Sequence, residues 1–388
     1  MLFDRSATWS RRSWYGAGIL AFGAALAGAL DLWRGSFGYD FAAYVLAARR
    51  LIDGLPLYPD EVVLGPFGQF LYPPVVAAML IPALAAPRVA AAVWMLLLLG
   101  TTILLGWSLV RGHERADRPW VAAAFVSFPP LLWDLSLGNV TLAALCLALL
   151  AWHLRARPAA AGSLLAASLA LKPLAAATLL VWTLTGRVRP VAWSILLALG
   201  VILITWPWLG QSWLDYARVL GAIATAAPGA VANIVPGALA TGPARWLLPI
   251  LAVCAATAGA LAARRGSLPG DHAFRLALAV GPLLSTTVWY PYLLFALPLL
   301  LAPGPTGLPW PGWGLRSVRV LAWVIMLAQA VREPGRSFVL PLFGLLILIL
   351  LGLLPVAASI RERASAEREP TEHADVSELA VEGGGRGV

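Results

Sequence analysis

The stretch "AAGSLLAASLALKPLAAATLLVW", residues 160–182, is apolar on both sides of a single Lys172–Pro173 pair. Similar apolar runs recur along the chain, which has 388 residues, 60% of them hydrophobic and 12% charged. An ordinary soluble domain carries about 25% charged residues. Because only internally hydrogen-bonded elements can cross a bilayer, this composition predicts an all-α polytopic membrane protein.

The apolar runs between charged loops predict about twelve transmembrane helices. They form a single domain over residues 1–360, followed by a charged, Gly-rich segment at 361–388 that we expect to be a disordered cytoplasmic tail. The predicted spans lie near residues 13–31, 88–110, 119–135, 139–154, 159–171, 173–186, 190–208, 244–262, 273–289, 291–303, 319–331 and 338–359.

Arginines decide the predicted orientation. If both termini are cytoplasmic, each of the short loops predicted to lie inside carries arginine, as the positive-inside rule requires. This orientation requires that the segment "YPPVVAAMLIPALAA", residues 72–86, does not cross the membrane. Pro73 and Pro74 would instead start a helix that lies at the outer membrane interface. The loops at 32–87 and 209–243 then lie outside. The arginines that decide this are Arg111, Arg115, Arg118, Arg155, Arg157, Arg187, Arg189, Arg264, Arg265, Arg316, Arg319, Arg361 and Arg363.

Several classes of function find no support in the sequence. The formal charge of +9 comes from arginines scattered between apolar runs, which argues against a nucleic-acid surface. The histidines fall at or inside the cytoplasmic face, so we expect no external zinc cluster, and no metal or other cofactor is invoked. P-loop, GxSxG and GxGxxG motifs are absent. Carboxylates in the external loops are therefore the candidate catalytic groups.

One carboxylate stands out in "GYDFAAYVLAARRLIDGLPLYPDE", residues 38–61. Asp40 lies near the start of a predicted short amphipathic helix that also carries Tyr44 and Arg49. An Asp at this position is often only a helix N-cap. The alternative is a base that takes a proton from a substrate hydroxyl.

Lys172 is the only lysine among 28 basic residues, and it lies between two apolar runs. A lysine ammonium is a compact charge suited to phosphate, and Pro173 would break the helix beside it. A lysine that snorkels to the membrane surface is the alternative interpretation. An intramembrane charge is by default functional, which favours the phosphate interpretation.

Polar and aromatic residues also fall on the predicted outer side. Trp and Tyr at such depths usually belong to the interfacial belt, although sugar faces also stack on these rings. The candidate substrate contacts are Tyr44, Tyr72, Asn139, Trp289 and Tyr292.

The chain resembles a known family in four blocks that follow one another in this order: "YDFAAYVLAARRLIDGLPLY", "FLYPPVVAAMLIPAL", "LSLGN" and residues 160–182. It resembles glycosyltransferase family 87, polyprenol-phosphate-mannose-dependent mannosyltransferases of the membrane-embedded GT-C superfamily. The resemblance implies a GT-C-type fold with external juxtamembrane helices in the first loop, including the Tyr72 block. It also implies that Asp40 activates the acceptor and that Lys172 meets the phosphate of the donor.

The expected function is therefore sugar transfer, with mannose as the expected sugar, from a polyprenyl-monophosphate donor to a lipid-linked or cell-envelope glycan acceptor. The reaction would invert the anomeric carbon at the outer face of the cell membrane. Lys172, helped by Arg49 or Arg218, would stabilise the leaving phosphate. The alternatives are a transporter or flippase for a lipid-linked or anionic substrate, which would also have broken helices, and an inert scaffold. The sequence shows no matching inverted halves.

Overall fold

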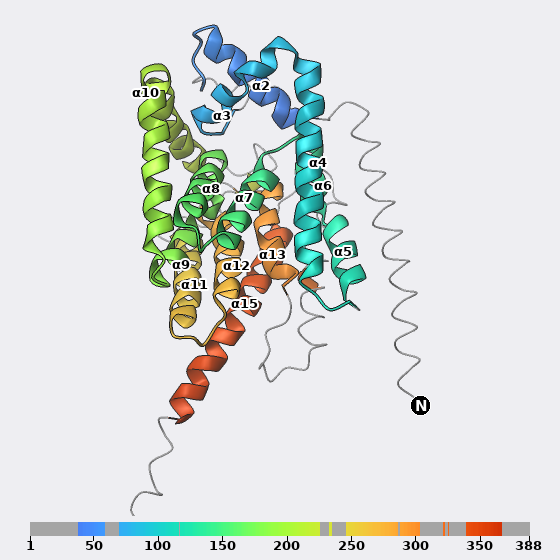
Figure 1. Cartoon of the computed structure of the whole chain (residues 1–388), viewed down its shortest axis with the longest axis vertical. Helices are drawn as coiled ribbons and strands as arrows, with labels where there is room; N and C mark the ends of the chain where they lie inside the picture. Colours follow the sequence, from blue (N-terminus) through green and yellow to red (C-terminus); the bar gives the residue numbers. More distant parts are fainter. Residues whose placement is uncertain are drawn as a thin grey trace, which may run out of the picture.

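The computed structural model of this chain describes residues 38–58, 70–115, 117–225, 233–234, 246–285, 288–302, 321–322, 325 and 339–366. Within these ranges the chain is a bundle of helices with one pair of two-residue strands (Figure 1). The predicted span at 13–31, nearly all of the one at 319–331, and residues 367–388 lie outside the described residues.

The helices and strands follow one another in a simple order. They are α2 (Tyr39–Ile52), α3 (Pro74–Met79), the 3-10 helix η2 (Ile81–Ala85), α4 (Pro87–Arg111), α5 (Arg118–Val126), α6 (Pro129–Leu137), α7 (Thr141–His153), α8 (Pro158–Leu171), η3 (Pro173–Ala177), α9 (Thr178–Leu184), α10 (Val188–Thr225), β1 (Asn233–Ile234), α11 (Leu247–Arg264), α12 (Gly270–Val280), η6 (Gly281–Leu284), β2 (Val288–Trp289), η7 (Tyr290–Ala296), α13 (Leu297–Leu300) and α15 (Val339–Ala366). β1 and β2 pair antiparallel, with Asn233 opposite Trp289.

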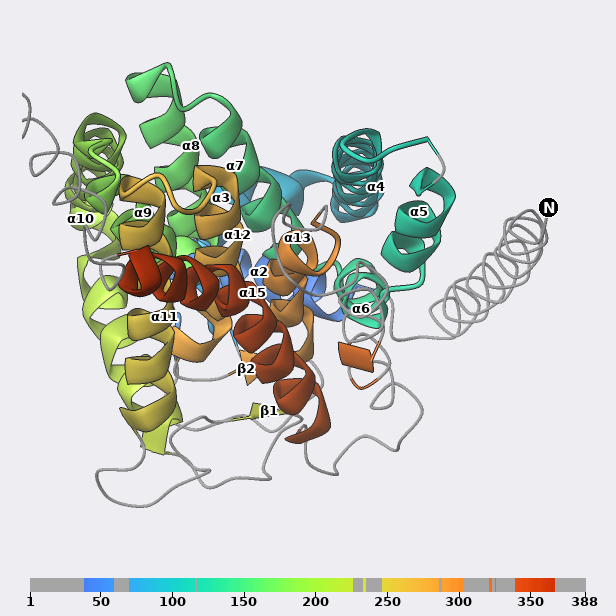
Figure 2. The same ribbon diagram turned by 90° about the horizontal axis from the view of Figure 1, so that it is seen from below.

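Three described helices are long and apolar enough to cross a membrane, namely α4, α10 and α11. In the apolar windows of α4 and α10 only 17% and 11% of the residues are buried. Leu97, Leu104 and Leu203 are among the exposed leucines. Exposed apolar area costs about 25 cal/mol per Å² in water, so these surfaces suit a lipid environment. α4 and α10 flank the bundle on opposite sides (Figures 1 and 2).

The predicted count of about twelve spans is not reached among the described residues. The three long helices become four candidate spans if α6 and α7, which meet at a bend of 115°, count as one broken span. Several other apolar helices are only 10–17 residues long, which corresponds to about 15–25 Å of helix. All of these helices are shorter than the roughly 30 Å hydrocarbon core of a bilayer.

Proline and glycine explain where the helices break. The predicted span at 119–135 is two helices, because Pro129 and Pro130 begin α6 after α5 has ended at Val126. α8 ends at Leu171 because Pro173 restricts Lys172 to an extended conformation, with φ −153° and ψ 128°. The sequence predicted this second break correctly.

Two predicted loop segments are helical instead. The loop expected at 209–243 begins inside α10, which continues through Pro207 to Thr225. A pairing of Asp215 with Arg218 one turn later supports this extension. α15 reaches Ala366, so the first six residues of the segment expected to be disordered are helical. Arg, Glu and Ala in this segment are good helix formers.

Residues 72–86 contain only the short elements α3 and η2. With 6 and 5 residues, neither can span a bilayer. They pack against α2 through a small apolar cluster that includes Tyr44, Tyr72 and Val76. A larger core lies among α7, α8, α9, α11 and α12. α2 and α3 lie at the upper end of Figure 1, and the α4–α5 and α11–α12 connections lie at the lower end.

Candidate active site

Asp40 lies in the first turn of α2 but is not the N-cap of that helix. Gly38 occupies the N-cap position with φ 78°, a left-handed conformation that favours glycine. The Asp40 side chain is only 2% exposed. The carboxylate makes no capping hydrogen bond to α2, and its hydrogen-bond partner lies in a distant part of the chain. Asp40 is therefore not a helix cap.

Asn139 is that partner and lies at the centre of the site. Its Nδ2 donates to Asp40 Oδ2 at 2.5 Å and to the Tyr72 hydroxyl at 3.0 Å. Its Oδ1 accepts a hydrogen bond from Lys172 Nζ at 2.8 Å. Because an ammonium can only donate, the amide oxygen must face Lys172 and the amide nitrogen must face Asp40. One amide therefore connects the two charged groups.

The chain turns sharply to bring Asn139 into the site. Gly138 ends α6 with φ 66°. A Cβ at Gly138 would lie 3.1 Å from the Cβ of Phe41 on α2, and the carbonyl of Gly138 accepts a hydrogen bond from Trp94 Nε1 at 2.8 Å. The glycine therefore permits both the left-handed turn and the close approach of α6 to α2.

Lys172 is buried, with 3% exposure, in the extended break between α8 and η3. Besides Asn139, its Nζ donates to Thr141 Oγ1 at 2.7 Å. It also lies 4.3 Å from the ring centre of Tyr292 and 4.9 Å from that of Tyr72. Two acceptors and two aromatic faces thus compensate for part of the cost of burying the charge.

No direct ion pair joins Asp40 to Lys172 in the part of the chain that the structure describes. Burial raises the pKa of Asp40 to about 6, although the charge of Lys172 and hydrogen bonds from Asn139 and Tyr72 lower it. A carboxylate with this pKa is ionised at neutral pH and can still accept a proton from a bound hydroxyl.

Tyr44 and Tyr72 form one wall of the site. Their rings meet edge to face, with centres 4.7 Å apart. The Tyr44 hydroxyl accepts from the Val140 backbone N–H at 3.4 Å, next to Asn139. The structure therefore brings together six of the predicted residues: Asp40, Tyr44, Tyr72, Asn139, Lys172 and Tyr292.

The two predicted arginines are not brought into this group. Arg49 is exposed near the far end of α2, nine residues or about 13 Å of helix from Asp40. Arg218 pairs with Asp215 at 2.9 Å, and its side chain is 66% exposed. Trp289 lies in β2, where its backbone pairs with Asn233.

Two further residues lie near the site: Thr141 has no role predicted from the sequence, and Asp134, at a predicted helix end, is only a weaker functional candidate. Thr141 accepts a hydrogen bond from Lys172. The only feature of the sequence that could have indicated this contact is the position of Thr141, two residues after Asn139 and at the start of an apolar helix. Asp134 is fully buried, and its Oδ2 accepts from the Leu142 N–H in the first turn of α7 at 3.0 Å, which satisfies one of the free donors at the start of that helix. Its Oδ1 has no hydrogen-bond partner among the described residues.

Metal ligands do not gather here: within the described ranges no three His, Cys, Asp or Glu side chains come together. Comparison with known families matches residues 70–291 to Glycosyltransferase family 87. This range includes Tyr72, Asn139, Thr141 and Lys172, whereas Asp40 precedes it. The same comparison with curated proteins and with solved structures finds no match.

Proposed function

This chain belongs to glycosyltransferase family 87, and we propose that it moves a sugar from a polyprenyl-monophosphate donor to a lipid-linked or cell-envelope glycan acceptor. The family and the apolar helices make it a membrane glycosyltransferase. The observation that carries the proposal is the buried group in which Asn139 connects Asp40 with Lys172. A carboxylate beside a fixed cation provides a base and a phosphate contact in one place. Mannose is the proposed sugar.

In the proposed reaction Asp40 takes the proton of the acceptor hydroxyl. The hydroxyl oxygen forms a bond to the anomeric carbon, on the side opposite the donor phosphate. The bond between that carbon and the phosphate oxygen breaks, and its electron pair leaves with the polyprenyl phosphate. The anomeric configuration is therefore inverted.

Lys172 is proposed to bind the phosphate as negative charge builds on it. In the structure its Nζ is held by Asn139 and Thr141, and both contacts are of hydrogen-bond length. An ammonium has three donors, so a phosphate oxygen could accept from the remaining one or replace one of these neutral acceptors, and its negative charge would make the contact stronger than either. The proposal assigns the phosphate to Lys172 without Arg49 or Arg218.

The proposed location of the reaction is the outer face of the cell membrane, in a GT-C-type fold of about twelve spans with both termini cytoplasmic. Two observations support the location. α2, which carries Asp40, lies at one end of α4, and the α4–α5 connection with Arg111 lies at the other end (Figure 1). The positive-inside rule places arginine-bearing connections in the cytoplasm.

The test is transfer of radiolabelled mannose by the purified full-length chain in lipid vesicles. The donor is polyprenyl-phosphate mannose, and a membrane extract provides the acceptors. We expect labelled glycolipid and an equal amount of released polyprenyl phosphate, and neither with Asp40→Asn. The matched control is Asp53→Asn, which makes the same change at an exposed position after α2.

Other outcomes would contradict the proposal. Movement of intact donor between the two leaflets, without any labelled product, would indicate the transporter or flippase. Product from a nucleotide-sugar donor but not from a polyprenyl phosphate sugar would keep the transferase class and remove the proposed donor.

A further inference from the structure

A second polar site lies at the opposite end of α7 from Asn139. α7 begins at Thr141, which binds Lys172, and Trp152 lies near its last residue, about 16 Å along the helix axis. Beside Trp152 a cavity of about 340 Å³ opens between the ends of α7, α9 and α11. Its polar lining consists of Trp152, Arg155, Thr185, Arg187, Arg264 and Asp271.

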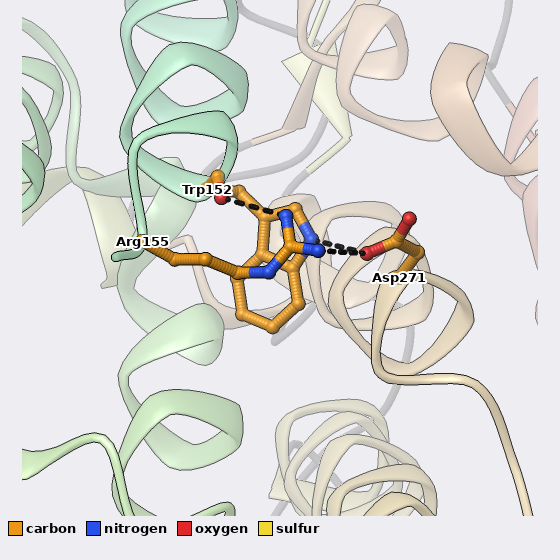
Figure 3. A network of polar contacts seen from close by, with 3 residues as sticks. All are labelled: Trp152, Arg155 and Asp271. Atoms are coloured by element: carbon orange, nitrogen blue, oxygen red, sulfur yellow. Dashed lines mark hydrogen bonds and ion pairs between the residues drawn. The ribbon is translucent and has the colours of Figure 1, made fainter. Parts of the chain in front are cut away.

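One wall of this cavity is rigid. The Trp152 ring stacks on Phe274 of α12, with ring centres 4.5 Å apart and planes 12° apart, and meets Trp182 edge to face at 5.0 Å. Its Nε1 donates to Asp271 Oδ1 at 2.7 Å (Figure 3). The indole is therefore held in one orientation by two rings and a hydrogen bond.

Two guanidinium groups approach this one indole from different connections. Arg155, after α7, lies 5.2 Å from the ring centre, and Arg187, before α10, lies 5.9 Å from it. Arg155 also donates to the Trp152 carbonyl at 3.1 Å and lies 3.6 Å from Asp271 Oδ1 (Figure 3). Both cations are thus gathered at one ring although they are far apart in sequence.

The charges of the lining are unbalanced. The lining contains three arginines and one carboxylate, that of Asp271. One oxygen of this carboxylate, Oδ1, already accepts the hydrogen bond from Trp152 and forms the ion pair with Arg155. In the described part of the chain, neither Arg187 nor Arg264 forms an ion pair with a carboxylate. An excess of positive charge around a hollow attracts an anion.

We propose that this cavity binds a phosphate group at a site separate from Asp40 and Lys172. A guanidinium presents N–H donors in a planar fork that matches two phosphate oxygens. The volume is at the lower end of the range of small-molecule pockets, roughly 300–1,000 Å³. The site lies between the ends of apolar helices, where basic pockets bind the headgroups of anionic lipids. The phosphate can belong to such a headgroup or to a soluble ion.

The experiment measures binding to the full-length protein in a neutral detergent. Native mass spectrometry counts bound phosphatidylglycerol, with phosphatidylcholine as the zwitterionic comparison, and thermal unfolding measures the stabilisation by each ligand. Inorganic phosphate in the millimolar range is added in a parallel series. The variants are Arg187→Gln, Arg264→Gln and both together. The matched control is Arg189→Gln, an exposed arginine two residues from Arg187 that does not line the cavity.

We expect phosphatidylglycerol to bind the wild type, and the double variant to bind it at least tenfold more weakly, because two charge-assisted contacts are lost. Arg189→Gln should bind as the wild type does. Arg187→Lys, which keeps the charge but not the fork, should lose several-fold affinity, and this variant decides the question if the double variant does not fold. Sugar transfer by Arg187→Gln in detergent should be unchanged.

The experiment distinguishes the two possible sources of the phosphate, a lipid headgroup and a soluble ion. Binding of phosphatidylglycerol that inorganic phosphate does not displace would identify a lipid headgroup, and binding of inorganic phosphate alone, with the same variants affected, would identify a soluble phosphate. Both outcomes support the site. Equal binding by the wild type and the double variant, equal loss in Arg189→Gln, or no binding of either ligand would overturn it. None of these results depends on the proposed donor.

Discussion

At the scale of single residues, Asn139 explains how a buried carboxylate and a buried ammonium can lie near each other without neutralising each other. A direct contact between Asp40 and Lys172 would satisfy each charge with the other, and a substrate would have to break it. The amide gives each charge a neutral partner of the right kind, a donor for Asp40 and an acceptor for Lys172. Neutral partners are weaker than charged ones, so substrate groups can replace them.

Asp40→Asn tests the base. The variant keeps the size and an acceptor oxygen but removes the proton acceptor, and we expect kcat to fall by roughly 10²–10⁴-fold. Asp53→Asn should change kcat by less than twofold, because Asp53 is exposed. The measurement is the initial rate of transfer at saturating donor. If Asp40→Asn retains activity within a few-fold, the buried Asp134 becomes the next candidate.

The pH dependence of the wild type tests the same group in a different way. Burial raises the pKa of Asp40 to about 6, and only the ionised form can accept a proton. kcat/KM should therefore rise about tenfold per pH unit below 6 and level off above it. The rate is measured from pH 4.5 to 8 with the protein shown to remain folded. A flat profile between pH 5 and 7 would exclude Asp40 as the titrating base in the free enzyme.

Lys172 tests the phosphate contact. Lys172→Met removes the charge, and the loss of a charge-assisted hydrogen bond worth about 1.5–3 kcal/mol should weaken the transfer rate at subsaturating donor by roughly ten- to a hundredfold. Lys172→Arg should also impair transfer, because a planar guanidinium does not fit between Tyr72 and Tyr292 as an ammonium does. Arg49→Met, at an exposed position, is the control. Wild-type rates in both Lys172 variants would remove Lys172 from the site.

At the scale of elements, the local sequence predicted where helices end but not which residues of different helices contact one another. Pro173 ends α8 and Gly138 ends α6 through conformational preferences of one or two residues, which a sequence displays. The contact of Thr141 with Lys172 depends on how α7 packs against α8, so it could not be predicted. The extension of α10 beyond residue 208 was missed for a related reason. Polar residues there suggested a loop, but helix propensity and the Asp215–Arg218 pair continue the helix.

Gly138→Ala tests whether the turn before Asn139 holds the site together. The left-handed conformation destabilises an alanine by about 1–2 kcal/mol relative to glycine. The added Cβ would also lie only 3.1 Å from the Cβ of Phe41. Gly186→Ala is a matched control, because Gly186 has φ 80° but nothing within 4 Å of the added Cβ. Both variants should unfold at lower temperature, but only Gly138→Ala should lose transfer activity. Equal activity in the two would show that the position of Asn139 tolerates the clash.

At the scale of the whole molecule, apolar composition and arginine positions predicted the helical membrane class, but not the number of full-length spans. Composition shows how apolar a segment is, whereas the length of a helix depends on where proline and glycine interrupt it and on what packs beside it. Several short apolar helices around Lys172 need neighbours to shield their ends from lipid. In this structure α10 and α11 pack against them, and among the described helices α4 and α10 carry the largest numbers of exposed large hydrophobic side chains.

The orientation of the whole bundle remains a prediction, and cysteine labelling of intact cells can test it. In a background in which Cys146 and Cys254 are replaced by alanine, single cysteines are introduced as Asp53→Cys, beyond α2, and as Glu114→Cys, in the α4–α5 connection; both positions are exposed. α2 and this connection lie at opposite ends of α4 (Figure 1). The positive-inside rule places Arg111 and its neighbours in the cytoplasm. A membrane-impermeant maleimide should therefore label Asp53→Cys in intact cells and Glu114→Cys only after permeabilisation. The reverse pattern would place Asp40 and Lys172 at the cytoplasmic face, and the sugar donor would then have to be bound from that side.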